Sequence, residues 1–213
     1  MEKLKSIFLF NKKRNLILLT LGFYCCSLLL IRAKITNSIF LFFLIWNLFL
    51  AIIPYMISLG INHYTIDNKF MKIGILLSWL IFLPNSFYVL TDFIHLSKST
   101  IVWLDLLLMS AFSITSFSFG ILSIKEIGIY LKKDGKQKLI TFLIPTVCLL
   151  CGFGIYLGRI LRFNSWNIIS DPINLFTGIF STLLTIEAIL FSFHFGIFIY
   201  LFYQLNSLYH EKK

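Results

Sequence analysis

Six long apolar runs constrain the fold of this chain more than any other feature of its sequence. A helix needs roughly 20 mainly apolar residues to cross a hydrocarbon core about 30 Å thick. The runs approach that length, with soft boundaries, and cover residues 15–31, 39–61, 70–90, 102–124, 139–161 and 176–202. None shows the period of two that a membrane strand requires. The sequence therefore predicts an all-α, polytopic transmembrane helix bundle of about six spans, which forms a single domain over residues 1–213.

The composition supports a membrane protein and disfavours a soluble one. Hydrophobic residues make up 58% of the chain and charged residues only 13%, whereas a soluble domain carries about 25% charged residues. So little polar surface remains that the apolar side chains must face lipid. The basic residues are mostly lysine and alanine is scarce, which is typical of AT-rich bacterial genomes. We therefore expect a multi-pass protein of the bacterial cytoplasmic membrane.

The basic residues predict how the chain is oriented. The net charge is +10, and its basic residues lie mainly in short segments between the apolar runs. With the N-terminus inside, 14 of the 19 Lys and Arg fall in inner segments, which agrees with the excess of basic residues on the cytoplasmic side of membrane proteins. Both termini are therefore predicted to be cytoplasmic. The inner lysines, including those around Asp134-Gly135, are expected to contact anionic lipid headgroups, and nucleic-acid binding is disfavoured.

The N-terminal segment resembles a signal peptide, because basic residues precede an apolar run. That run ends in Ile31-Arg32-Ala33-Lys34 without a small-x-small cleavage site, so we expect an uncleaved first span. The chain also has a CxxC pair, Cys148 and Cys151, within an apolar run. Since no neighbouring charge favours a thiolate, we expect these cysteines to serve packing rather than redox or metal chemistry.

Polar side chains gather at the end of the third apolar run. Asn85, Tyr88, Asp92 and His95 follow Pro84 at steps of three, four and three residues. If the helix continues past the proline, they share one face and form a polar stripe at the outer membrane boundary. Alternatively, the proline breaks the helix, Asn85 caps the break, and Asp92 and His95 form a surface pair.

The fourth run begins with Trp103 and Asp105. A tryptophan at this level is an ordinary interfacial anchor. An acidic residue inside a span is costly and usually faces the bundle or water. Asp105 would enter from the same side of the membrane as Asp92 and His95.

Two of only four arginines, Arg159 and Arg162, lie one helical turn apart at the end of the fifth run. A guanidinium can grip a phosphate or carboxylate with two hydrogen bonds, which lysine cannot do. The alternative is that both arginines extend to outer headgroups. Gly154 and Gly158 precede them with the GxxxG spacing of a helix-packing face. We expect an ion pair between one of these arginines and Asp92 or Asp105.

The sixth run contains Glu187 and, seven residues later, His194. Ionisable residues inside a span indicate function by default. The alternative is a neutral glutamic acid that forms hydrogen bonds within the bundle.

Together these helix ends suggest an acid–base and anion-binding site at the outer face. The candidate catalytic residues are Asp92, His95 and Asp105, and the candidate substrate-binding residues are Asn85, Tyr88, Arg159, Arg162, Asn164 and Trp166. The cofactor is unknown, and whether Asp92 and His95 bind a metal stays open. The chain has no phosphate-binding glycine loop, HExxH or GxSxG motif, which disfavours the chemistries that depend on them.

Two stretches of the sequence resemble a known family. The first contains Phe82-Leu83-Pro84-Asn85, Tyr88, Thr91-Asp92, His95-Leu96, Trp103 and Asp105, and the second runs from Gly154 through Arg159, Arg162 and Asn164-Ser165-Trp166 to Pro172. Both are similar to motifs of an uncharacterised bacterial membrane family, domain of unknown function 1361. The resemblance extends from about Trp46 to the last span. It implies a polytopic membrane protein and no particular activity.

Two departures from the family pattern are visible. Ser86-Phe87 follows Pro84-Asn85 where Ala-Pro is more usual, and Asn167 stands where aspartate is expected. The second difference removes a carboxylate, so position 167 is a poor candidate for metal or acid chemistry.

The sequence supports three functional hypotheses. The first is binding or processing of a lipid or lipid-linked anion at the outer face of the membrane. The second is a non-catalytic transport component or assembly partner in which the same residues are structural. The third is proton-coupled transport through Glu187 and His194, although the inverted repeats that would favour it are absent from the sequence.

Overall fold

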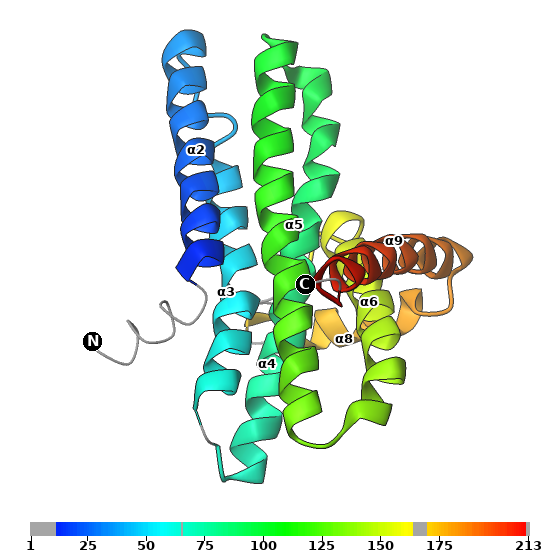
Figure 1. Ribbon diagram of the computed structural model, residues 1–213. Coiled ribbons are helices and arrows are strands. Elements are labelled where there is room, and N and C mark those ends of the chain that lie inside the picture. Colours follow the sequence, from blue (N-terminus) through cyan, green and yellow to red (C-terminus); the bar gives the residue numbers. More distant parts are fainter. Residues whose placement is uncertain (1–11, 65, 164–169, 212–213) are drawn as a thin grey trace.

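The computed structural model describes residues 12–64, 66–163 and 170–211, and this part of the chain is all-α (Figure 1). Its helices, numbered as in the figure, are α2 (Lys12–Thr36), α3 (Phe43–His63), α4 (Lys69–Tyr88), the 3-10 helix η1 (Val89–Lys98), α5 (Val102–Lys133), α6 (Gln137–Arg159), α8 (Pro172–Thr182) and α9 (Ile186–Glu211). Six helices are long and apolar enough to cross a membrane. The prediction of an all-α membrane bundle with six spans is confirmed; its orientation stays a prediction.

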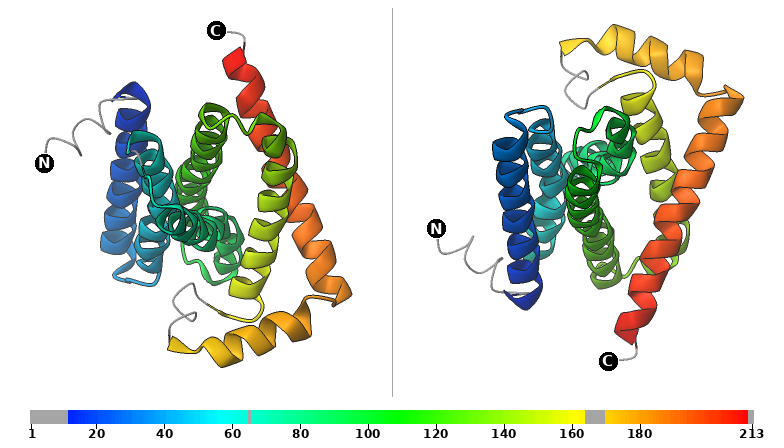
Figure 2. Two further views of the ribbon diagram at one scale, coloured as in Figure 1. Left: turned by 90° about the horizontal axis from the view of Figure 1, so that it is seen from below. Right: turned by 90° about the horizontal axis from the view of Figure 1, so that it is seen from above.

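Helix α5 is the centre of the bundle. It is 32 residues long. Of its most apolar 18-residue stretch, 67% is buried inside the structure, whereas the corresponding share for α9 is 17%. One buried apolar cluster joins α5 to α2, α3 and η1, and a second joins it to α3, α4, α6 and α9. In Figure 1, α2 and α3 lie along one side of α5, whereas Figure 2 shows α9 crossing α6 on the other side.

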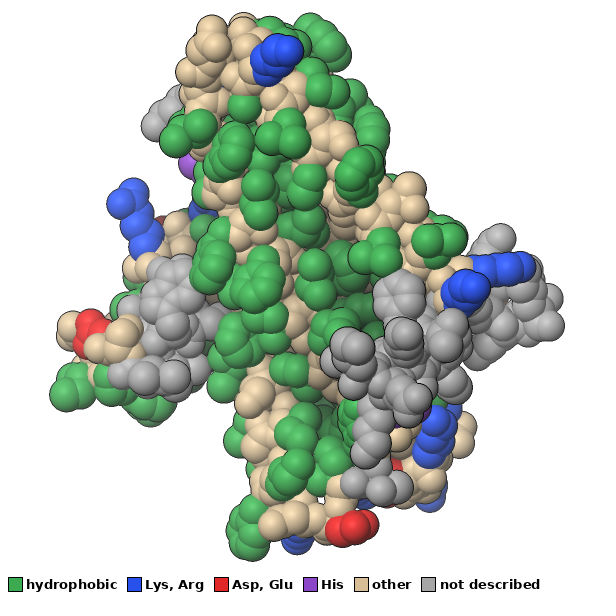
Figure 3. Space-filling view, turned by 90° about the vertical axis from the view of Figure 1, so that its left-hand side faces the viewer, with side chains coloured by type: hydrophobic (Ala, Val, Ile, Leu, Met, Phe, Trp, Pro, Cys, Tyr) green, Lys and Arg blue, Asp and Glu red, His purple; other side chains and the backbone are tan. Residues whose placement is uncertain are grey.

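Much of the molecular surface is apolar. Figure 3 shows hydrophobic side chains over the middle of one face, while most charged side chains in view lie towards its margins. Large side chains such as Phe23, Phe142 and Leu184 are more than three-quarters exposed. This is the surface expected of a protein whose outer side chains face lipid rather than water.

The last apolar run is divided, contrary to the prediction of one span over residues 176–202. Helix α8 ends at Thr182 and α9 begins at Ile186. The hydroxyl oxygen of Thr185 accepts a hydrogen bond from the backbone N–H of Ala188 at 3.4 Å, as at a helix N-cap. With 11 residues, α8 is too short to span a membrane. It lies across the end of α6 (Figure 2).

The third span continues past its proline. Pro84 lies inside α4, which ends at Tyr88 and is followed by η1 up to Lys98. The side chain of Asn85 donates to the carbonyl of Phe82, 3.0 Å away within the same helix. The alternative that Pro84 breaks the helix and Asn85 caps the break is therefore wrong.

Candidate functional site

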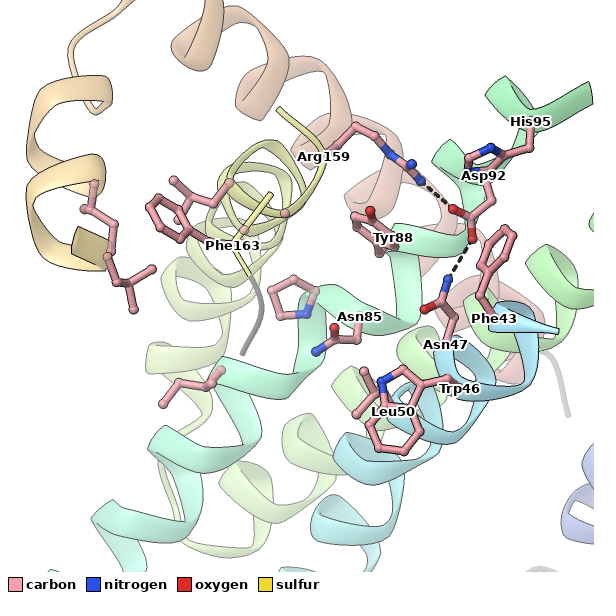
Figure 4. Close-up of a pocket in the computed structure, with 17 residues that line it drawn as sticks. Phe43, Trp46, Asn47, Leu50, Asn85, Tyr88, Asp92, His95, Arg159 and Phe163 are labelled. Carbon is pink, nitrogen blue, oxygen red and sulfur yellow. Dashed lines mark hydrogen bonds and ion pairs between the residues drawn. The ribbon is translucent and has the colours of Figure 1, made fainter. Parts of the chain in front are cut away.

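A cavity of about 290 Å³ lies between α3, α4, η1, α6 and α8 (Figure 4). Among the residues predicted for the site, Asn85, Tyr88, Asp92, His95 and Arg159 line it. The first four come from α4 and η1 at the predicted spacing, and Arg159 comes from the end of α6. The volume is near the lower end of the range for ligand pockets, which begins at about 300 Å³. It suits a small polar group or a headgroup rather than a whole lipid.

An ion pair in the wall of this cavity joins Asp92 to Arg159. Nη2 of Arg159 donates to one carboxylate oxygen of Asp92, and the amide of Asn47 donates to the other at 2.9 Å. The side chain of Asp92 is only 2% exposed, whereas that of Arg159 is 18% exposed. The guanidinium, rather than the carboxylate, therefore faces the open side of the pair.

Two further contacts fix the guanidinium in place, and one of them is itself held by a hydrogen bond to Tyr88. Its Nε donates to the hydroxyl of Thr91 at 2.7 Å, and that hydroxyl donates to the carbonyl of Tyr88 at 2.7 Å. The guanidinium carbon lies 4.4 Å from the centre of the Tyr88 ring, within the range of a cation–π interaction. Nη1 has no hydrogen-bond partner among the described residues. Within the described part of the chain, Arg159 is thus oriented before any ligand arrives and retains unused N–H donors.

The GxxxG glycines explain how α6 approaches α4 so closely. A Cβ atom at Gly154 would lie 2.6 Å from Cγ of Pro84, and one at Gly158 would lie 3.1 Å from the ring of Tyr88. Both glycines also line the cavity. The predicted packing face therefore brings Arg159 within reach of η1.

The polarity of the cavity changes along its length. Its charged and imidazole groups, Asp92, Arg159 and His95, lie at the η1 end. One to two turns earlier on α4, Tyr88 and Asn85 provide a phenol and an amide. Beyond them the lining is apolar, with Leu50, Ile81 and Trp46; the last two are 38% and 52% exposed. The cavity therefore has a polar end and an apolar, open flank.

His95 lies beside the ion pair in Figure 4. Its ring packs edge-on against Phe43, with ring centres 5.1 Å apart. In the described part of the chain, no group of three His, Cys, Asp or Glu residues is placed to hold a metal ion. Within the described residues, Asp92 and His95 therefore have no third His, Cys, Asp or Glu beside them that could complete a metal site.

Asp105, a predicted catalytic residue, does not line this cavity. Its two carboxylate oxygens accept hydrogen bonds from Nε and Nη2 of Arg32 at 2.9 and 3.3 Å, and the hydroxyl of Ser99 donates to it at 2.7 Å. The side chains of Arg32 and Asp105 are 3% and 1% exposed. The expectation that Asp105 joins Asp92 and His95 is wrong, because α2 supplies a closer cation.

The remaining predicted binding residues are not placed in the site. Arg162 has a positive φ of 60°, is exposed and does not line the cavity. The chain turns out of α6 at this point, so Arg162 does not share a helical face with Arg159. Asn164 and Trp166 lie outside the described residues.

Glu187 and His194 are also separate from the cavity. Glu187 is exposed in the first turn of α9, where a negative charge favours the helix dipole. His194 is exposed as well, and its Nδ1 lies 2.7 Å from the carbonyl oxygen of Leu190. The two residues do not face the interior of the bundle.

The cysteines lie in apolar surroundings, and their expected packing role stays a prediction. All four are free; Cys148 and Cys151 are fully buried in α6. Buried thiols without a neighbouring cation are generally inert.

Several residues of the polar network were missed in the sequence. Asn47 and Thr91 complete the site around Asp92 and Arg159. Near the opposite end, Arg14 donates to the buried Glu126 at 2.8 Å. The available signals were weak: an amide within the second apolar run and an acid just beyond the fourth.

Comparison with known proteins adds a family. Neither the curated proteins nor the solved structures include one that matches this chain. A family model described as "Protein of unknown function (DUF1361)" matches residues 46–202. Every lining residue of the cavity except Phe43 lies in that range, whereas Arg14 and Arg32 precede it. The match covers most of the chain, as the sequence motifs predicted, and the chain therefore belongs to the DUF1361 family.

Proposed function

We propose that this protein binds an amphiphile with an anionic headgroup, a lipid or a lipid-linked molecule, in the cavity beside Arg159. The observation that carries the proposal is the guanidinium itself. It is held by Asp92, Thr91 and Tyr88 at the wall of a headgroup-sized cavity, and its Nη1 has no partner among the residues that the structure describes. A fixed guanidinium binds phosphate or carboxylate with little further loss of conformational freedom.

Asp92 does not abolish this attraction. Both of its oxygens already accept hydrogen bonds, from Arg159 and Asn47, and its side chain is nearly inaccessible. An incoming anion therefore meets the N–H groups of Arg159 before it meets the carboxylate. The same engagement makes Asp92 a poor general base, which favours binding over catalysis.

The polarity gradient supports an amphiphile rather than a soluble anion. A headgroup at the η1 end would place an attached chain beside Leu50, Ile81 and Trp46. Ile81 and Trp46 are partly exposed on the apolar surface of the bundle. A chain leaving along this flank would enter the hydrocarbon core. On the predicted orientation, the headgroup would come from the outer leaflet of the cytoplasmic membrane.

The test compares two identical substitutions at neighbouring arginines. The full chain is reconstituted in phosphatidylcholine nanodiscs, and retention of added phosphatidylglycerol is measured by native mass spectrometry. Arg159→Lys keeps the charge but loses the fork, so retention at this site is expected to fall about tenfold, as for one charge-assisted hydrogen bond. Arg162→Lys is the matched control and is expected to retain lipid like the wild type.

Two outcomes would contradict the proposal. Equal losses in both variants would mean that the arginines merely attract headgroups. Unchanged retention in Arg159→Lys, with the protein folded, would favour the alternative of a non-catalytic assembly partner, in which the ion pair is structural.

A further inference from the structure

A second cavity, of about 310 Å³, lies at the opposite end of the bundle from η1. It is formed where α3 ends, α4 begins and α5 ends, at the bottom of Figure 1. Its polar lining consists mainly of Asn62, Asp67, Lys72, Tyr130, Lys133 and Asp134. The distribution of basic residues predicts that this end faces the cytoplasm.

Two buried polar atoms of this lining have no hydrogen-bond partner among the described residues: Oδ1 of Asn62 and the hydroxyl of Tyr130. The Nδ2 group of Asn62 fixes the orientation of the amide. It donates to the backbone carbonyl of Glu126 at 2.7 Å and to the carboxylate oxygen Oε2 of Glu126 at 3.2 Å. The amide therefore cannot rotate freely to satisfy its own oxygen. Leaving such groups unsatisfied costs about 1–3 kcal/mol each. Their presence at one cavity indicates a missing polar partner.

Positive charge surrounds the same cavity. The ammonium of Lys72 lies 4.9 Å from the centre of the Tyr130 ring and 3.5 Å from Asp134. Lys136 pairs with Asp134 at 2.7 Å, which offsets the charge of that carboxylate. Lys133 is exposed and has no ion-pair partner among the described residues. The carboxylate of Asp67 is the other negative charge of the lining, which therefore holds two lysines and two aspartates. Lys136, which pairs with Asp134 from outside the lining, makes the local balance positive by one charge.

We propose that this inner cavity binds a phosphate ester that carries a hydroxyl group. Lys72 and Lys133 contact the phosphate, the hydroxyl of Tyr130 donates to it, and Oδ1 of Asn62 accepts from the ligand hydroxyl. Basic pockets between membrane helices at the cytoplasmic surface commonly bind phospholipid headgroups. A glycerol phosphate headgroup provides both the anion and the hydroxyl. This site does not depend on the function proposed for the Arg159 cavity.

The test uses a substitution that removes a single oxygen. In Tyr130→Phe, the unpartnered hydroxyl is lost while the ring beside Lys72 remains. The melting temperature of the full chain in phosphatidylcholine nanodiscs is measured with added phosphatidylglycerol, and separately with glycerol 1-phosphate in solution. Phosphatidylglycerol is expected to stabilise the wild type, and its apparent affinity is expected to be about tenfold lower in Tyr130→Phe, as for loss of a hydrogen bond to a charged group.

A pair of neighbouring lysines gives the control for charge. Lys133 lines the cavity, whereas Lys132 is exposed and does not. Lys133→Gln is expected to weaken phosphatidylglycerol binding, and Lys132→Gln is expected to leave it within about twofold of the wild type, because one screened surface charge contributes little. Equal effects of the two substitutions would overturn the site in favour of general attraction to headgroups.

The remaining outcomes are also decisive. Stabilisation by phosphatidylglycerol alone supports a lipid ligand, whereas stabilisation by glycerol 1-phosphate as well supports a soluble phosphate ester at the same site. Stabilisation by neither overturns the proposal. A Tyr130→Phe protein that is more stable without ligand, yet responds to phosphatidylglycerol like the wild type, would also overturn it, because the hydroxyl would then be only an unsatisfied group. Since Arg159 lies at the other end of the bundle, the effects of Tyr130→Phe and Lys133→Gln are expected to be the same in an Arg159→Lys background, whether or not phosphatidylglycerol also binds beside Arg159.

Discussion

Two arginine–aspartate pairs of the same chemistry differ in how completely the protein encloses them. Nε and Nη2 of Arg32 donate hydrogen bonds to Asp105, and Nη1 donates to the carbonyl of Ser38 at 3.2 Å. Nη2 of Arg159 donates a hydrogen bond to Asp92 and Nε donates to Thr91, while Nη1 has no hydrogen-bond partner among the described residues. The first guanidinium is 3% exposed and the second 18%. Every guanidinium nitrogen of the closed pair donates to the protein, whereas Nη1 of the open pair has no partner in the described part of the chain.

The comparison separates a structural ion pair from a candidate binding site. Burial and an opposite charge are common to both pairs and therefore do not indicate function. The informative features are the Nη1 nitrogen of Arg159, which has no partner among the described residues, and the cavity that Arg159 lines. The closed pair clamps α2 to α5, while the open pair joins α6 to η1. Substitutions at the two arginines should consequently differ in kind as well as in size.

The largest expected effect is loss of the closed pair. Arg32→Leu leaves the carboxylate of Asp105 buried without a cation, which typically costs about 3–5 kcal/mol. The free energy of unfolding, measured by denaturant titration in detergent micelles, should fall by that amount. Arg159→Leu should cost less, because Asp92 keeps Asn47 and adjoins a cavity that water can enter.

The double variant Arg32→Leu with Asp105→Leu provides the control, since an apolar pair of this kind often restores stability. It should recover most of the loss. If Arg32→Leu costs less than Arg159→Leu, the assignment of the closed pair as the stronger structural element is wrong.

Lysine substitutions should show the difference in kind. Arg32→Lys keeps the charge but cannot make both hydrogen bonds to Asp105, so the free energy of unfolding should fall by about 1–3 kcal/mol. Arg159→Lys should lower stability by only about 1 kcal/mol, as for loss of the hydrogen bond from Nε to Thr91, while lowering lipid retention about tenfold. Equal loss of stability in both variants, with unchanged retention, would remove the distinction between the pairs.

A smaller effect concerns the helix contact that positions Arg159. In Gly154→Ala, the new methyl group would lie 2.6 Å from Pro84, and overpacking of this kind costs about 1–3 kcal/mol. Gly74→Ala is the control, because nothing lies within 4 Å of the added atom and alanine favours helix by about 0.5–1 kcal/mol. The melting temperature should therefore fall for the first and rise slightly for the second. A neutral Gly154→Ala would show that α6 can shift without cost.

The sequence predicted the polar stripe of α4 and η1 that contains Asp92, but it did not predict the whole site around the open pair. Asn85, Tyr88, Asp92 and His95 follow from helical spacing alone, since α4 continues through Pro84. Asn47 could not be assigned in the same way. It lies 45 residues from Asp92 in sequence, and a single amide in an apolar run carries no information about its partner.

The closed pair shows why the sequence cannot decide which of several charged residues at the same membrane depth form an ion pair. Asp105 and Asp92 were both expected beside Arg159 or Arg162, because all were predicted at outer helix ends. In the structure Asp105 pairs with Arg32, 73 residues away. Depth follows from hydropathy, but the helix that lies beside α5 follows from tertiary packing. Glu126 was missed for a related reason: α5 continues to Lys133, beyond the apolar run from which its end was predicted.

The smallest effect is expected at an exposed ion pair, which completes the series from closed to open to solvent-exposed. Asp134 lies in the loop after α5, where a hydrogen bond from Lys136 and the charges of Lys136 and Lys72 lower the pKa of its carboxyl. A lowered pKa in the folded state stabilises the protein above the unfolded pKa of about 3.9, and this stabilisation disappears as the pH falls through the folded pKa. The melting temperature of Asp134→Asn should therefore lie slightly below that of the wild type at pH 7, and the difference should shrink as the pH falls below the unfolded pKa of about 3.9. It should also shrink in 0.5 M salt, because exposed charges are screened.

Asp67→Asn is the control, since Asp67 is exposed at the same end and has no ion pair among the described residues. A difference that grows as the pH falls would contradict the sign of the Asp134 shift, and one as large as that of Arg32→Leu would mean that burial does not set the order of the three pairs.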